Sequence, residues 1–169
     1  MSLPIEFQYM PKLLPPNMDS LTNPDHDWCI MEDWKSPPIN GKIICVRGGI
    51  KLPNNEHFGF WTDGITVPPL AWTISGISPL SMPELCWALP HDMAYAAELA
   101  PREICDNWLF EFTIMTGTNR IKRNLIYGLV RRFGGLVWDK HTKESIANAR
   151  KVCQLINVGE TPVWEPILV

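Results

Sequence analysis

The distribution of proline is the feature of this sequence that most restricts its fold. Most of the sixteen prolines lie in the first half of the 169-residue chain. Proline fixes φ and lacks a backbone N–H, so it is disfavoured in helix interiors and in central strands. We therefore expect loops and short strands in the first half, and helices after them.

Three segments of the first half carry strand patterns. Gly41–Pro53 predicts a strand with a turn or bulge at Gly48–Gly49, and Asp27–Trp34 is compatible with one further strand. His57–Trp72 predicts a strand, then a turn at Asp63–Gly64, and then an extended exit held by two consecutive prolines.

Helical signals begin at Ser81, which forms a capping-box pattern with Glu84. The first predicted helix runs toward Leu99 and contains Pro90, which is expected to kink or split it just before His91. Three more helices are predicted over Pro101–Gly117, Thr118–Gly135 and His141–Ile156. Apolar residues at helical spacing predict the inward faces of the second and third helices: Trp108, Leu109, Phe112 and Met115, then Ile121, Leu125, Leu129 and Phe133.

The predicted fold class is α+β: a small antiparallel β-sheet in the N-terminal half, followed by about four helices. A helical hairpin carries the His-Asp motif. The two halves are too small to stand alone, so residues 1–169 are predicted to form a single domain. Within it, residues 1–40 form an irregular proline-rich arm, residues 41–75 a β-rich part and residues 81–157 a helical part.

Composition and cysteine usage argue against several classes of protein. With 46% hydrophobic and 20% charged residues the chain can fill a core, and its net charge of −3 indicates no nucleic-acid partner. The odd number of cysteines, without a CxxC pair, disfavours a zinc knuckle or a disulfide scaffold. We expect buried free thiols in a reducing compartment, no signal peptide and no membrane helix of ~20 apolar residues. The cysteines are Cys29, Cys45, Cys86, Cys105 and Cys153.

The segment CWALPHDMAY places His91 and Asp92 in an otherwise apolar helix. At helical spacing His91, Asp92 and Tyr95 can share one side, and the short connection at Ala100–Pro101 brings Asp106 of the next helix toward them. A carboxylate facing an imidazole orients a catalytic histidine, and an adjacent carboxylate can hold a cation. The alternative is a buried polar pair with a purely structural role.

Two further features have open interpretations. Asp63, in the turn of FWTDGITVP, can present a carboxylate to a cation or merely turn the chain. The third predicted helix is basic and can lie on anionic lipid or another protein, or it can be a solvated face. Its basic residues are Arg120, Lys122, Arg123, Arg131 and Arg132.

Four segments together resemble a known family. FWTDGITVPPLAW, HDMAY, CDNWLFEF and RNLIYGLVRRFGG follow the order seen in a bacteriophage-associated family of uncharacterised proteins, the domain of unknown function 1353. The match covers about Phe58 to Gly135; Cys105 stands where alanine is usual, and Pro90 precedes the histidine. The resemblance implies a phage or prophage origin and a cluster of acidic and histidine side chains, but no established activity. The clustered residues are Asp63, His91, Asp92 and Asp106.

HDMAY is also similar to the H-D-x-C-Y helix motif of secreted phospholipases A2. This local similarity implies that His91 activates water, Asp92 binds calcium, Asp106 supports the histidine and Tyr95 is a hydrogen-bond partner. Ala94 replaces the motif's cysteine, and both the disulfide framework and the glycine-rich calcium loop are missing. The similarity therefore serves as an analogy of mechanism.

These observations lead to one main hypothesis of function and one alternative. The main hypothesis is a phage-encoded, small metal-assisted hydrolase of ester or amide bonds, phospholipase-like or directed at the cell envelope. Its catalytic residues would be His91, Asp106 and Tyr95, and its divalent cation, calcium or another, would be held by Asp92 and Asp63. The alternative is a non-catalytic virion or tail accessory protein; an inhibitor of a host protein has no specific support. Expected partners are other virion proteins or an envelope substrate, and the expected location is the host cytoplasm during infection or the virion.

Overall fold

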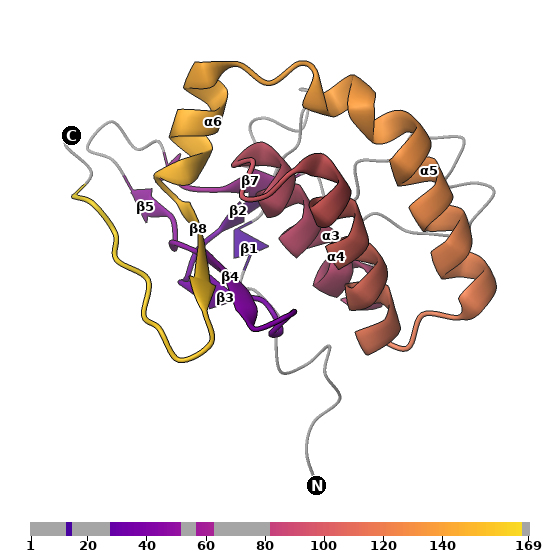
Figure 1. The fold of residues 1–169 in the computed structure, drawn as a ribbon. Helices are drawn as coiled ribbons and strands as arrows, with labels where there is room; N and C mark the ends of the chain where they lie inside the picture. The colour runs from indigo at the N-terminus through magenta and orange to yellow at the C-terminus, as the bar shows by residue number, and fades with distance from the viewer. Residues whose placement is uncertain (1–12, 15–27, 52–56, 63–81, 167–169) are drawn as a thin grey trace, which may run out of the picture.

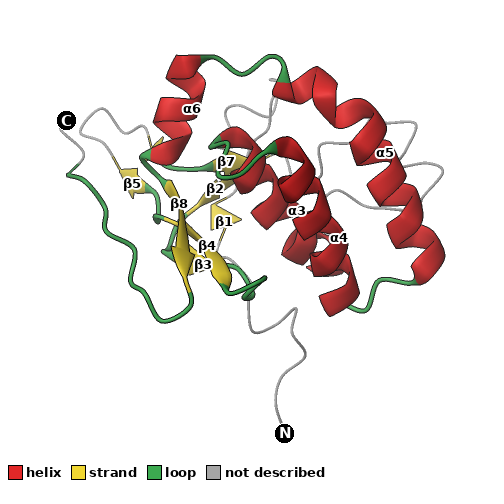
Figure 2. Ribbon diagram, viewed as in Figure 1, coloured by secondary structure: helices red, strands yellow, loops and turns green. Residues whose placement is uncertain are grey.

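A computed structural model describes residues 13–14, 28–51, 57–62 and 82–166 of the chain (Figure 1). Among these described residues, short strands precede four helices, and one more strand follows them (Figure 2). The elements are β1 (Leu13–Leu14), β2 (Trp28–Ile30), β3 (Trp34–Lys35), β4 (Lys42–Val46), β5 (Ile50–Lys51), β6 (His57–Phe58), β7 (Trp61–Thr62), α3 (Met82–Ala96), α4 (Arg102–Met115), α5 (Arg120–Trp138), α6 (Lys143–Arg150) and β8 (Cys153–Asn157). The α+β prediction is confirmed.

The strands form small antiparallel sheets in the orders β1-β2-β7, β3-β4-β8 and β5-β6. The strand predicted over Gly41–Pro53 corresponds to β4 and β5, and the predicted break at Gly48–Gly49 lies between them. The strand predicted over Asp27–Trp34 corresponds to the two strands β2 and β3. The predicted capping residue Ser81 and the turn at Asp63–Gly64 lie outside the described residues.

The last predicted helix is wrong in its second half. Instead of running over His141–Ile156, the helix α6 ends at Arg150, and the chain continues as β8. Strand β8 pairs with β4 over five residues, from Lys42 opposite Asn157 to Val46 opposite Cys153. The pairing hydrogen-bonds β8 to β4 along one edge, and Cys153 and Ile156 of β8 are buried, so tertiary contacts override the local helical pattern.

Pro90 does not split α3, contrary to one of the predicted outcomes, and the helix continues across it. A proline removes only one helical N–H, here the donor to the carbonyl of residue 86. Leu89 and Met93, on either side, are fully buried, so packing holds the helix on both sides of the proline.

The inward face of α5 also differs from the prediction. Ile121 is 83% exposed and Phe133 is exposed as well, whereas Ile126 and Val130 are buried. The buried stripe is therefore rotated by about one residue from the predicted one, because α5 packs with this face on α4. The predicted stripe of α4 is confirmed for Trp108, Leu109 and Phe112, which are buried, and Met115 packs against them in part.

The helices α3 and α4 lie between the sheet and α5 (Figure 1). Side chains from α3, α4 and the β3-β4-β8 sheet form one hydrophobic cluster, in which Trp87, Phe112 and Ile44 are fully buried. Arg150 of α6 binds the segment that follows α3: its side chain donates hydrogen bonds to the carbonyls of Ala97 at 2.7 Å and Glu98 at 3.0 Å. In the part of the chain described here, no helix is long and apolar enough to cross a membrane.

We expect Ile44→Ala to lower the free energy of unfolding by about 2–5 kcal/mol, because it leaves a cavity in this cluster. Ile121→Ala, the same truncation at an exposed position, should change it by about 0.5 kcal/mol or less. Chemical denaturation followed by circular dichroism measures both variants. Equal losses would contradict the described core.

Candidate functional site

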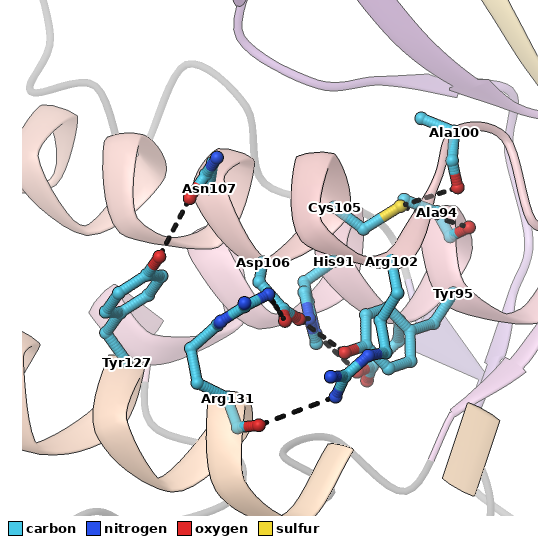
Figure 3. A network of polar contacts seen from close by, with 11 residues as sticks. His91, Ala94, Tyr95, Ala100, Arg102, Cys105, Asp106, Asn107, Tyr127 and Arg131 are labelled. Atoms are coloured by element: carbon cyan, nitrogen blue, oxygen red, sulfur yellow. Dashed lines mark hydrogen bonds and ion pairs between the residues drawn. The ribbon is translucent and has the colours of Figure 1, made fainter. Parts of the chain in front are cut away.

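The α3–α4 hairpin brings together His91, Tyr95 and Asp106, as the sequence predicted, and α5 adds Arg131 (Figure 3). His91 and Tyr95 lie one turn apart on α3, and Asp106 faces them from the second turn of α4. The predicted convergence therefore occurs, and it occurs inside the protein, because all three residues are buried.

Asp106 is the centre of the cluster and is 0% exposed. Its Oδ1 accepts a short hydrogen bond from the Tyr95 hydroxyl and lies 3.4 Å from Nε2 of His91. Its Oδ2 accepts a hydrogen bond of 3.0 Å from Nη1 of Arg131. Both oxygens of the buried carboxylate are thus paired, one of them with a full positive charge.

His91 lies between two carboxylates and is 8% exposed. Its Nε2 faces Asp106, and its Nδ1 lies 3.6 Å from Oδ1 of Asp92. The side chain of Asp92 keeps a 17% exposed fraction, so the Nδ1 side of the ring is the side nearer to solvent. The Tyr95 ring contacts the imidazole, with ring centroids 4.2 Å apart.

Burial and hydrogen bonding act in opposite directions on these groups. Burial lowers the pKa of His91, but the hydrogen bonds and charges of Asp106 and Asp92 outweigh it, so this pKa lies above the usual 6.5. Burial raises the pKa of Asp106, but hydrogen bonds from His91, Tyr95 and Arg131 bring it below 3.8. Burial and the Asp106 carboxylate raise the pKa of Tyr95 far above its usual value. The phenol therefore stays protonated and donates a hydrogen bond to Asp106.

Cys105 precedes Asp106 and is a buried free thiol, as predicted for the cysteines. Burial raises the pKa of this thiol to about 12, so it is protonated at neutral pH and unsuited to act as a nucleophile. Its Sγ lies 3.4 Å from the carbonyl oxygen of Ala100, where it links α4 to the turn of the hairpin. Cys45, Cys86 and Cys153 are also buried and free, and the side chain of Cys29 lies outside the description.

Arg131 is the member of the cluster whose role the sequence reasoning missed, because it was grouped with a basic helix face. It bridges Asp106 and Glu103, the latter at 2.9 Å. Two other basic residues of α5 also have internal contacts: Lys122 pairs with Glu84, and Arg123 lies over the ring of Phe110. Two signals could have indicated this role. A buried aspartate needs a positively charged partner, and α5 is the next helix along the chain that could supply one.

The predicted cation ligands are only partly described. Asp63 lies outside the described residues, and within those residues no group of three or more His, Cys, Asp or Glu side chains is arranged to hold a metal ion. Asp92 provides one carboxylate, and the oxygens of Asp106 are already paired with Tyr95, His91 and Arg131. The described residues alone therefore do not form a cation site, and further ligands would have to come from elsewhere.

No family model matches the chain, and neither a curated protein nor a solved structure matches it. The resemblance to the phage-associated family therefore stays a prediction that rests on the four quoted segments.

The His91 cluster gives a pH-dependent contribution to stability whose direction follows from the raised pKa. The stabilisation is fully present below the unfolded value of about 6.5 and is lost as the pH rises through the folded pKa of His91. We expect the difference in unfolding free energy between wild type and His91→Gln to shrink over this rise, measured by urea denaturation between about pH 5 and pH 9. Asp106 contributes to stability in a separate, lower pH range, because its stabilisation is lost only as the pH falls through its lowered pKa. A constant difference across the range would contradict the described pairing of His91.

Proposed function

We propose that the chain is a small hydrolase of ester or amide bonds in which His91 is the general base. One observation carries the proposal: the two ring nitrogens of His91 face two carboxylates in different environments. Asp106 is buried and charge-paired, whereas Asp92 is partly exposed. In such an arrangement the buried carboxylate orients the imidazole through one ring nitrogen, and the other ring nitrogen accepts a proton in the reaction.

In the proposed mechanism the neutral imidazole donates Nε2–H to Asp106, so Nδ1 carries the lone pair. A water molecule beside Nδ1 and Asp92 gives its proton to Nδ1, and its oxygen attacks the carbonyl carbon of the substrate. The Asp106 carboxylate, kept ionised by Arg131, stabilises the imidazolium that forms. When the carbon–oxygen or carbon–nitrogen bond breaks, Nδ1 returns the proton to the leaving alcohol or amine.

A divalent cation, calcium or another, is part of the proposal but not of these steps. When bound, it would stabilise the negative charge that develops on the carbonyl oxygen. Asp92 would be one ligand, and Asp63 is the proposed second. The proposed substrates are lipid or peptidoglycan of a host envelope, consistent with the similarities to the phage-associated family and to the phospholipase motif.

The complete pairing of the Asp106 carboxylate oxygens favours one competing function. Its two oxygens are paired with three side chains and have no exposed surface, as expected of a cluster that only holds helices together. On that alternative the chain is a non-catalytic virion or tail accessory protein of a phage. Mass spectrometry of purified virions tests it, because such a component would be present in stoichiometric amounts.

We expect His91→Gln to lower kcat/KM for ester hydrolysis by at least about 100-fold while the fold is retained, because the base is removed. His141→Gln is the matched control, since His141 pairs with Glu98 and not with Asp106, and this variant should keep wild-type activity. Wild-type activity should rise with pH as His91 loses its proton.

The assay uses anionic phospholipid vesicles, peptidoglycan and small chromogenic esters, each with calcium, with other divalent cations and with a chelator. Activity that survives the chelator would remove the cation from the proposal. If wild type hydrolyses none of the substrates under any condition, or if His91→Gln is as active as wild type, the hydrolase proposal is wrong.

A further inference from the structure

The backbone of α5 passes very close to the Tyr95 hydroxyl at Gly134. A Cβ atom built on Gly134 would lie 2.6 Å from Oη of Tyr95, closer than real Cβ atoms approach another heavy atom. The next nearest atoms, Cζ and Cε1 of the same ring, are at 3.4 and 3.5 Å, which is ordinary van der Waals contact. The conflict is thus confined to one oxygen atom, the one that donates to Asp106.

We infer that Gly134 is a positioning residue of the His91 site: the missing side chain lets the Tyr95 hydroxyl lie against α5 and reach Oδ1 of Asp106. His91 faces the same oxygen, so the hydroxyl and the imidazole share Oδ1 as a hydrogen-bond acceptor. The position of the hydroxyl therefore affects the hydrogen bond between Oδ1 and His91. The inference deepens the proposed function, on which its consequence for catalysis rests. The contact itself does not depend on any activity.

The other glycines of α5 serve as matched controls. A Cβ on Gly128 would meet nothing within 4 Å, and a Cβ on Gly135 would meet only the end of the flexible Arg102 side chain at 3.5 Å. Glycine inside a helix is less favourable than alanine, so alanine should stabilise α5 wherever space permits. Of these three positions, the fold therefore requires glycine for space only at Gly134.

The first measurement is the NMR signal of the Tyr95 hydroxyl proton, which reports the hydrogen bond from this hydroxyl to Asp106. It is recorded in wild type, Gly134→Ala and Gly128→Ala, and Tyr95→Phe identifies the signal. We expect Gly134→Ala to shift or lose this signal and Gly128→Ala to keep it as in wild type, because only the Gly134 Cβ would meet the hydroxyl. A wild-type hydroxyl signal in Gly134→Ala would overturn the inference.

The second measurement is a double-mutant cycle with Tyr95→Phe, which removes the conflicting oxygen. Gly134→Ala should raise the unfolding equilibrium constant of wild type. In the Tyr95→Phe background it should lower that constant by roughly fivefold, the effect of a helical Gly-to-Ala change, which is also expected for Gly128→Ala.

If Gly134→Ala does not fold, recovery of a folded protein in the double variant supports the inference, and failure of the double variant overturns it. Equal destabilisation by Gly134→Ala in both backgrounds overturns it as well. A wild-type protein without hydrolytic activity would overturn the proposed function and leave these two measurements valid.

Discussion

The burial of the Asp106 carboxylate is the constraint on which the arrangement of the helices depends. An ionised carboxylate without partners costs several kcal/mol in a protein interior, so its partners must be in place when the helices pack. Tyr95 and His91 come from α3, and Arg131 comes from α5. One charge on α4 thereby fixes the positions of its two neighbouring helices. The protonation state of His91 is in turn coupled to the packing of all three.

Internal contacts account for three of the five basic residues predicted on α5, in a chain of net charge −3. Lys122 and Arg131 are paired with carboxylates, and Arg123 lies with Cζ 5.5 Å from the centre of the Phe110 ring. Each basic residue near an anionic membrane contributes about 1 kcal/mol to binding. These three are engaged by side chains of α3 and α4, and Arg120 and Arg132 of α5 lie outside these contacts. Lys122, Arg123 and Arg131 are explained by the acidic and aromatic side chains of α3 and α4 that they contact.

Features that depend on local spacing could be predicted from the sequence, and features that depend on distant pairing could not. Helical periodicity and a short connection were enough to place His91, Tyr95 and Asp106 together. One of the two partners of β4 is β8, which follows it by more than a hundred residues, and no local pattern distinguishes that strand from the end of a helix. The orientation of α5 was missed because its sequence carries apolar residues on more than one face, and the contact with α4 selects among them. The role of Arg131 follows from that orientation.

The position of Asp92 is where the proposed hydrolase and the structural alternative differ in what they require of His91. Helix α3 is buried on nearly every side from Leu85 to Met93, so a polar group within it must be paired by the protein. Asp106, Tyr95 and Arg131 already complete a structural cluster. Asp92 adds a second carboxylate on the opposite ring nitrogen and retains access to solvent. In a cluster that served packing alone, Asp92 would pair with the imidazolium of His91. In the proposed hydrolase, the same partly exposed position places Nδ1 beside solvent. The partial exposure beside Nδ1 is therefore the feature on which the proposed hydrolase rests.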